Sequence, residues 1–168
     1  MYLYARKYVS KNDYTNFDRE KAEKPPINEE WKTLATLSPK GLMDNSQDFG
    51  EISISFPVGY WRKANAVHGW FVNNLAGGLD ECQEIHVPRN ALVDLLAACK
   101  AVMSVSVAES KQDVADEFGL NPTEGFFFGG YELDEFYDED IKYTIKMIEC
   151  VLENTSPQKI EFVYQASW

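Results

Sequence analysis

The stretch GYWRKANAVHGWF, residues 59–71, gathers the side chains of this chain that are best suited to hold a ligand. Arg62 and Lys63 carry positive charge, Asn65 carries an amide, and His68 is one of only two histidines. Backbone N–H groups at the beginning of a helix attract anions, and neighbouring cations strengthen that attraction. If a helix begins near this point, the stretch predicts a pocket for a phosphate or a carboxylate.

The same stretch has a second interpretation, as an ordinary helix of the core. A helix is predicted over residues 60–75, ended by the glycine pair that follows. On this helix Trp61, Ala64, His68 and Phe71 share a stripe that is typical of a buried face. His68 would then be a core histidine with satisfied hydrogen bonds. Trp70 lies on another side of the helix, where a single buried face does not explain a large aromatic.

Other residues that could do chemistry form weaker patterns. Cys82, Glu84 and His86 alternate along a predicted short strand, so their side chains would project from one face. These side chains can bind zinc, but no second Cys or His pair lies nearby. His68 is the best candidate for the acid/base of a small enzyme. Because no P-loop, dinucleotide-binding, metalloprotease or serine-hydrolase motif occurs, the sequence assigns no catalytic residue, metal or cofactor.

The run ELDEFYDED, residues 132–140, is the second strongly charged feature, with six acids in nine positions. Acids at the beginning of a helix complement its dipole, so the sequence predicts a solvated helix start and no metal site. The alternative is an acidic surface that binds a basic protein. A ligand site is expected to concentrate in residues 60–70, and an interaction surface in residues 132–140.

Composition excludes several classes of protein. The 168 residues include 27 acids and 16 bases, which gives a net charge of −11. Broad nucleic-acid binding is not expected, because phosphate contacts need clustered Lys and Arg. Three cysteines without a CxxC pair favour a reducing compartment. With no apolar run near the roughly 18 residues of a membrane span and no signal peptide, we expect a cytoplasmic protein without membrane contact; its oligomeric state is not indicated.

The elements that must position these residues alternate between strands and helices. Residues 10–50 form a long polar connection or flap, with a short helix near 29–37 that Asn28 would cap. The strands are short and half polar, so the chain is predicted to be a single α+β (or α/β) domain over 1–168. Its sheet would be mixed or largely antiparallel, with about three main helices. Strands are predicted at 2–9, 51–56, 84–87, 126–128 and 160–168, and helices at 60–75, 88–103, 113–118 and 134–153. The inner face of the last helix is predicted to consist of Tyr137, Ile141, Ile145, Ile148 and Leu152.

Three pieces of the chain together resemble a known family. They are GYWRKANAVHGWFV (59–72), GFFFG (125–129) followed by YELDEFYDEDI (131–141), and FVYQASW (162–168). They are similar to a family of small, functionally uncharacterised proteins of tailed bacteriophages and prophages, over most of residues 51–168. The resemblance implies a cytoplasmic accessory protein of an infected bacterium and carries over no catalytic residue. The positions that match its motifs are Trp61, Arg62, Lys63, Asn65, His68, Trp70, Phe71, Phe127, Gly129 and Trp168.

The leading hypothesis is a non-enzymatic protein that binds an anionic, nucleotide-like small molecule, with a counter-defence role if it sequesters a host signal. The pocket would lie between the helix at 60–75, the strand at 126–128 and the C-terminal strand. Aromatic rings would stack on a flat group while cations hold the anion. The alternatives are an acidic interaction module or inhibitor of a host protein, and a small enzyme using His68. The candidate binding residues are Tyr60, Trp61, Arg62, Lys63, Asn65, His68, Trp70, Phe127 and Trp168.

Overall fold

The structure, a computed structural model, describes residues 1–15, 17–18, 21, 24–37, 50–106, 108–123, 130–156 and 160–167. The chain divides into two compact units. The larger unit consists of Met1–Ala5 and Phe56–Trp168, and the smaller unit is Arg6–Ser55. The strand predicted at 126–128 with Phe127, and also Trp168, lie outside the described residues.

The described residues form four strands and five helices, so the predicted α+β class is confirmed. The strands make one antiparallel sheet in the order β2-β1-β4-β3. None of the helices in the described part of the chain combines the length and the apolar composition that crossing a bilayer requires. In chain order the elements are β1 (Tyr2–Ser10), α1 (Glu29–Ala35), β2 (Glu51–Tyr60), α2 (Asn65–Leu75), β3 (Ile85–Val87), α3 (Arg89–Met103), α4 (Ala108–Glu117), α5 (Glu135–Asn154) and β4 (Glu161–Gln165).

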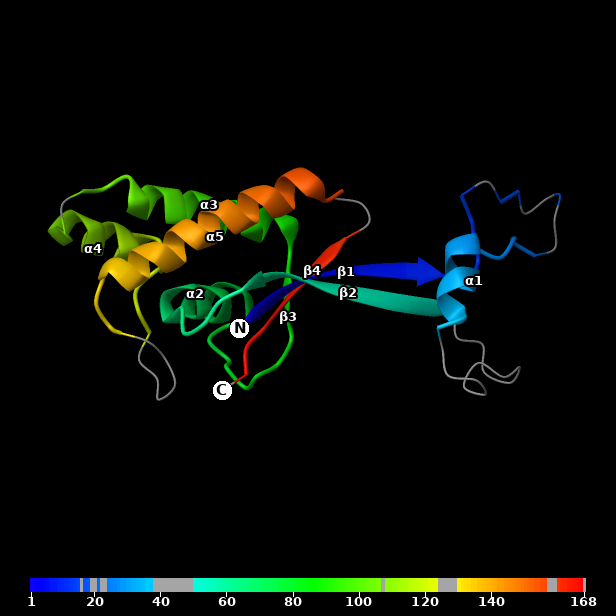
Figure 1. Cartoon of the computed structure of the whole chain (residues 1–168), viewed down its shortest axis with the longest axis horizontal. Helices are drawn as coiled ribbons and strands as arrows, with labels where there is room; N and C mark the ends of the chain where they lie inside the picture. The colour runs from blue at the N-terminus through cyan, green and yellow to red at the C-terminus, as the bar shows by residue number, and fades with distance from the viewer. Residues whose placement is uncertain are drawn as a thin grey trace. The chain divides into compact units, whose positions relative to one another are not determined.

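The core of the larger unit lies between the sheet and its helices. In the β3–β4 pair, Ile85 lies opposite Tyr164 and Val87 lies opposite Phe162. Because alternate residues of a strand face opposite sides, these four buried side chains share one face. Figure 1 shows α3, α4 and α5 grouped together on one side of the strands of this unit, and α3 packs directly on α5. The fully buried side chains that fill this layer include Leu92, Leu95 and Cys99 of α3 and Ile141 and Ile148 of α5.

The boundary between β2 and α2 differs from the prediction. β2 runs on to Tyr60 through Pro57, and α2 begins only at Asn65. Pro57 is tolerated because β2 is at the edge of the sheet, where a missing N–H removes no necessary hydrogen bond. The backbone of Lys63 is in the left-handed region, with φ of 64°, so the helix cannot extend back through it.

Helix α2 is buried on all sides over its first eight residues. The predicted burial of Trp61, Ala64, His68 and Phe71 is confirmed, since each is at most 2% exposed. The expectation of one buried face is wrong, because Trp70 is buried as well. The loop before the 124–129 segment closes on this helix so tightly that a Cβ on Gly69 would lie 2.1 Å from Thr123 Oγ1.

Two of the other helices begin as predicted. Asp134 caps α5 by accepting a hydrogen bond from the Tyr137 N–H at 2.9 Å, and Pro88 precedes α3. The helix predicted at 113–118 is longer, because α4 begins at residue 108. Lys111 of α4 forms an ion pair with Asp138 of α5, which holds the two helices together.

The smaller unit contains the predicted short helix. Asn28 caps α1 by accepting a hydrogen bond from the Glu30 N–H at 2.9 Å, as expected for an asparagine at this position. Lys7 of β1 pairs with Glu30, and a bridge joins Asn12 to Ile27. The described residues of this unit are therefore tied together by hydrogen bonds and ion pairs.

Candidate ligand-binding site

Trp61 fixes the connection between β2 and α2. Its backbone N–H donates to the carbonyl oxygen of Met1 at 3.0 Å, and its own carbonyl accepts from the Met1 nitrogen at 3.1 Å. The buried indole Nε1 donates to Thr144 Oγ1 at 2.8 Å, and that hydroxyl donates to the carbonyl oxygen of Asp140 at 2.7 Å. The connection is thus tied to Met1, which directly precedes β1, and to α5, so the two residues that follow Trp61 have a defined position.

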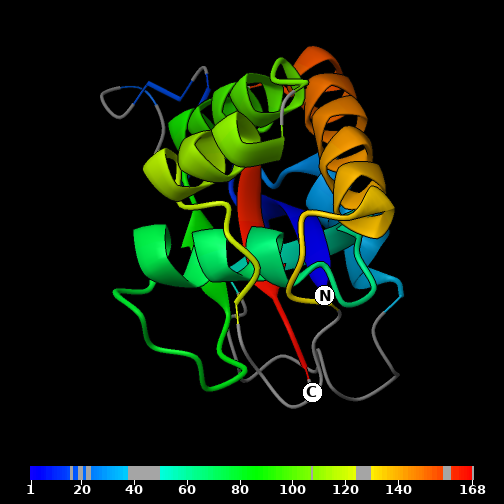
Figure 2. The same ribbon diagram turned by 90° about the vertical axis from the view of Figure 1, so that its left-hand side faces the viewer.

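A cavity of about 260 Å³ opens at the beginning of α2. One wall is formed by residues 62–67, and the other by Gly130 and the beginning of α5. In Figure 2, α2 is the horizontal green helix, and α5 begins at its yellow-orange end. The stretches at 60–70 and 132–140, to which the sequence assigned rival functions, therefore share one cavity. Its charged and amide side chains are Arg62, Lys63, Asn65, Glu132, Asp134 and Asp140.

The first wall is an uncapped helix N-terminus with two cations. Arg62 and Lys63 are exposed, and neither side chain has a hydrogen bond or an ion pair with another described residue. Ala64 occupies the cap position and supplies no side-chain hydrogen bond. The backbone N–H groups of Ala66 and Val67 also have no acceptor within the described ranges. This end of α2 therefore presents free donors and positive charge to the cavity, an arrangement that attracts anions.

Asn65 joins the two walls. Its side chain is buried, with 5% of the residue exposed, and its Nδ2 donates to the carbonyl oxygen of Gly130 at 2.9 Å. The Oδ1 atom of the same amide has no hydrogen-bond partner among the described residues. Asn65 thus holds residue 130 against α2 and leaves one buried acceptor for a ligand.

The second wall carries carboxylates in different environments. Asp134 caps α5, so the acidic run lies at a helix start as predicted, and four of its six acids are exposed. Asp138, which is paired with Lys111, and Asp140 are only partly exposed. Asp140 is half-buried, and no other described residue forms a hydrogen bond or an ion pair with its carboxylate. Burial, followed by the neighbouring charges of Glu139 and Asp134, raises the pKa of Asp140 to about 6.

This raised pKa predicts a pH-dependent stability. The pKa of Asp140 rises from 3.8 to about 6 on folding, so the folded state favours the protonated acid. The contribution of the protonated Asp140 side chain to the free energy of unfolding is present at low pH. It is lost as the pH rises from about 4 through about 6, because the carboxyl group then has to ionise in a half-buried position. We expect Asp140→Asn to raise the free energy of unfolding at pH 8 by about 1–2 kcal/mol, after discounting for solvent screening of a half-exposed group.

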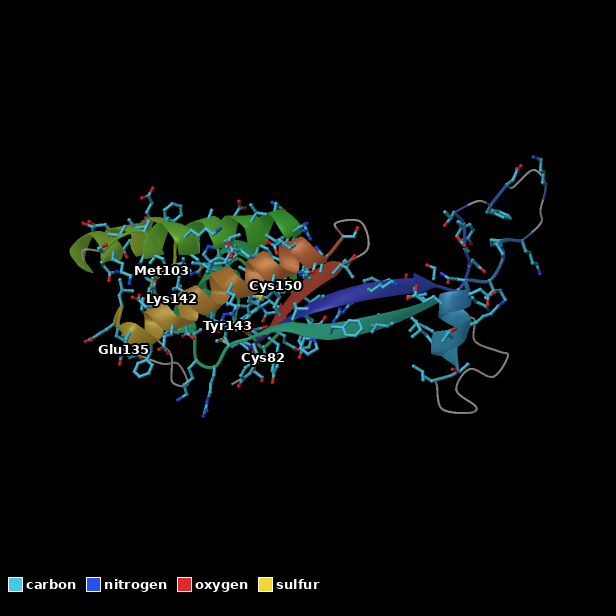
Figure 3. All side chains as sticks on the ribbon, turned by 45° about the horizontal axis from the view of Figure 1, so that its top comes forward. Cys82, Met103, Glu135, Lys142, Tyr143 and Cys150 are labelled. Atoms are coloured by element: carbon cyan, nitrogen blue, oxygen red, sulfur yellow. The ribbon has the colours of Figure 1, made fainter. Side chains whose placement is uncertain are left out.

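Urea unfolding of both proteins at pH 5 and pH 8 measures this effect. The increase in the free energy of unfolding of Asp140→Asn over the wild type should be larger at pH 8 than at pH 5. Glu135→Gln, an exposed position in the first turn of α5 that is labelled in Figure 3, is the control and should show little difference. Equal effects of Asp140→Asn at both pH values would contradict the burial of this carboxylate.

His68 lies outside the cavity wall, and both of its ring nitrogens are engaged. Nδ1 lies 2.7 Å from the Tyr164 hydroxyl, and Nε2 lies 3.0 Å from an Asp80 carboxylate oxygen. The histidine is 2% exposed, so it links α2, β4 and the loop after α2 from within the core. The geometry describes a structural hydrogen-bond network, as in the core interpretation of the sequence.

Only some of the other predicted binding residues line the cavity, and the rest lie elsewhere in the larger unit. Tyr60 turns its ring toward Tyr2, at 4.9 Å between centroids, and its backbone N–H donates to the Tyr143 hydroxyl. Trp61 and Trp70 are core residues. Of the nine predicted residues, the structure brings Arg62, Lys63 and Asn65 to the cavity, and β4 contributes no residue to its wall.

The zinc-competent residues do not share a strand face. β3 begins only at Ile85, so Cys82 and Glu84 lie in the preceding loop, where the backbone of Cys82 has φ of 58°. Within the described ranges, no three side chains from His, Cys, Asp and Glu lie close enough together to hold a metal ion.

The sequence analysis did not predict that the acids of residues 132–140 line the same cavity as Arg62 and Lys63. Asp140 is adjacent to Ile141 and three residues from Tyr137, which are both on the predicted inner face of α5. This spacing was the one signal that Asp140 is partly buried. Nothing in the sequence indicated that residues 62–67 and 130–141 would meet.

Comparison of the chain with protein-family models, with curated proteins and with solved structures found no significant match in any of the three. The resemblance to phage and prophage proteins therefore stays a prediction from the motifs. The cavity at the beginning of α2 is the feature from which a function has to be inferred.

Proposed function

We propose that this protein binds an anionic, nucleotide-like small molecule in the cavity at the beginning of α2 and does not catalyse a reaction on it. The observation that carries the proposal is that Arg62 and Lys63, two cations without a partner among the described residues, lie at an uncapped helix N-terminus. Both features favour a phosphate, and each charge-assisted hydrogen bond contributes roughly 1.5–3 kcal/mol.

The cavity is held in shape without a ligand, which favours binding. Trp61 is fixed by hydrogen bonds to Met1 and to Thr144 of α5, and Asn65 is fixed to Gly130. A prepared site loses less conformational entropy when the ligand binds. The volume of about 260 Å³ lies just below the roughly 300–1,000 Å³ of typical small-molecule pockets, so a mononucleotide suits it better than a larger cofactor.

The lining also restricts the kind of anion. Three carboxylates, Glu132, Asp134 and Asp140, line the same cavity as the two cations. They would repel a long polyphosphate or a nucleic-acid strand, but leave room for one anionic group at the cationic wall. Phe136, which is 67% exposed and lines the cavity, offers an aromatic face to a flat ring.

The biological role that we propose is accessory. If the protein belongs with the phage and prophage proteins that its motifs resemble, it would act in the cytoplasm of an infected bacterium. Sequestering a nucleotide signal of the host would then serve as counter-defence. This role depends on the binding of a nucleotide and on the resemblance.

The double variant Arg62→Ala/Lys63→Ala tests the proposal. We expect it to fold with unchanged thermal stability, because both side chains are exposed and have no described partner. Its affinity for a mononucleotide should fall roughly 10- to 100-fold, as the loss of charge-assisted contacts implies. Isothermal titration with a panel of 5′-mononucleotides at low salt measures the affinity, beside a thermal melt.

The matched control is Lys142→Ala/Lys146→Ala on α5. It removes the same charge from two exposed lysines that do not line the cavity, and Lys142 is labelled in Figure 3. The control should retain wild-type affinity. A wild-type protein that binds no nucleotide, or a control that loses binding as strongly as the test variant, would contradict the proposal.

A second candidate function is an acidic interaction module for a basic host protein. The observation in its favour is the exposure of two aromatics, Tyr131 at 57% and Phe136 at 67%, beside the exposed acids Glu132 and Glu135. Such a surface suits a partner with basic and apolar groups. This candidate is favoured if nucleotides do not bind and a host protein can be cross-linked to the chain in infected cells. The cross-link should be lost with Glu132→Gln/Glu135→Gln and retained with Arg62→Ala/Lys63→Ala.

A further inference from the structure

Both walls of the cavity carry hydrogen-bond acceptors that have no donor among the described residues. The Asp140 carboxylate is half-buried and has no partner among the described residues. The Oδ1 atom of Asn65, a residue that is 5% exposed, is also without a donor in the described part of the chain. A ligand that fills the cavity takes both acceptors out of contact with water, so it has to supply N–H donors to them in place of water.

Nucleobases differ in the donors that they can bring. Guanine presents two adjacent donors, the N1–H and the 2-amino group, and a carboxylate can accept both at once. Adenine presents a donor beside an acceptor, its N1 atom, which would face the carboxylate without a hydrogen bond. A site built to accept hydrogen bonds discriminates strongly against a ligand that cannot donate them.

We infer that the nucleotide bound in this cavity is a guanine nucleotide, with its base paired to Asp140 and its phosphate at Arg62, Lys63 and the beginning of α2. This inference rests on the proposed function and adds the identity of the base. The Asn65 oxygen is a further acceptor for the base, next to the cationic wall. The remaining carboxylates, Glu132 and Asp134, keep additional phosphates away, so a monophosphate is the best match.

The position of Asp140 suits it for this role. Its backbone carbonyl accepts a hydrogen bond from Thr144 Oγ1 at 2.7 Å, and Thr144 is in turn held by Trp61. The turn of α5 that bears the carboxylate is thereby coupled to the connection that bears the two cations. The distance between the two walls is therefore fixed by the fold, as recognition of both ends of one ligand requires.

Titration of GMP, IMP and AMP tests the inference, because the three share the phosphate and differ in the base edge. Wild-type protein should bind GMP at least about tenfold more tightly than AMP, as expected for one charge-assisted hydrogen bond. IMP, which lacks the 2-amino group, should lie between them. Asp140→Asn should lose the preference for GMP, since an amide can pair with adenine as well. Glu135→Gln, which removes an exposed charge from the same helix, should retain the preference.

The outcomes separate this inference from the proposed function. Equal binding of GMP and AMP to the wild type, abolished by Arg62→Ala/Lys63→Ala, would overturn the guanine assignment and leave nucleotide binding intact. An equal loss of GMP and AMP affinity in Asp140→Asn would also overturn it. Absence of binding by all three nucleotides would overturn the proposed function itself. L-Arginine carries a similar pair of donors with a carboxylate, and its binding in place of GMP would overturn the choice of a nucleotide.

Discussion

Replacing Phe71 by Ala is expected to lower the free energy of unfolding by roughly 3–5 kcal/mol, the range for truncating a fully buried phenylalanine. Phe71 is 0% exposed and stacks on Tyr164, with 4.1 Å between ring centroids and 16° between ring planes. Trp61 and Trp70 make edge contacts with the same ring, at 6.1 Å and 5.6 Å. Its removal would leave a cavity among three aromatic side chains that cannot easily close.

Urea unfolding measures this loss of stability, and two further variants serve as comparisons. Phe71→Leu keeps most of the buried volume and should lose clearly less stability than Phe71→Ala. Val93→Ala on α3 shortens a side chain that is 49% exposed and should change stability by less than about 0.5 kcal/mol. A Phe71→Ala effect as small as that of Val93→Ala would contradict the packing of α2 against β4.

The second large effect is expected from His68→Phe, which should lower the free energy of unfolding by about 2–4 kcal/mol. The change keeps a ring of similar size but removes both hydrogen bonds, and it leaves the hydroxyl of Tyr164 unpaired in the core. An unsatisfied buried polar group costs about 1–3 kcal/mol, and the lost bond to Asp80 adds to this. Stability should fall, whereas nucleotide affinity should stay the same because His68 does not line the cavity.

A double-mutant cycle with Tyr164→Phe isolates the hydrogen bond between the two side chains. The double variant should be less destabilised than the sum of the single variants, because removing the hydroxyl also removes the unpaired group. Strict additivity would show that the two side chains do not interact. A large loss of ligand affinity in His68→Phe at unchanged stability would instead support the enzyme or ligand role that the sequence left open.

Local signals allowed much of the fold to be predicted. Asn28 was identified as a helix cap and Asp134 as the beginning of a helix, and both side chains accept a backbone hydrogen bond from the first turn. The apolar spacing of Tyr137, Ile141 and Ile148 predicted the buried face of α5. These features depend on residues within one or two turns of each other, which is the range over which a sequence pattern carries information.

The β2–α2 boundary was mispredicted because its cause is not local. Pro57 and Gly59 are typical of strand ends, but β2 lies at the sheet edge, where a proline can continue the strand. Gly59 also lies against the Met147 side chain, with 3.1 Å between a built Cβ and its nearest atoms, so the glycine allows α5 to approach. Both reasons depend on the neighbours that these residues acquire in the folded sheet.

Only one wall of the candidate site could be predicted. Arg62, Lys63 and Asn65 were identified from the combination of charge and an expected helix start. The acids of the opposite wall were noticed but assigned to a separate surface, because 62 residues of sequence, 68–129, lie between the walls. Trp61 and Trp70 were taken for ligand contacts, since the sequence does not show that α2 is enclosed on all sides.

The central claim is that an anion binds at the N-terminus of α2, and an amide-resolved NMR titration with GMP and AMP tests it most directly. The predicted result is that the backbone amides of Ala66, Val67 and Gly130 shift with increasing nucleotide, while those of His86 and Val163 in the β3–β4 pair stay in place. These shifts should vanish in Arg62→Ala/Lys63→Ala. Nucleotide-dependent shifts confined to residues away from the cavity, or no shifts at millimolar nucleotide, would contradict the claim.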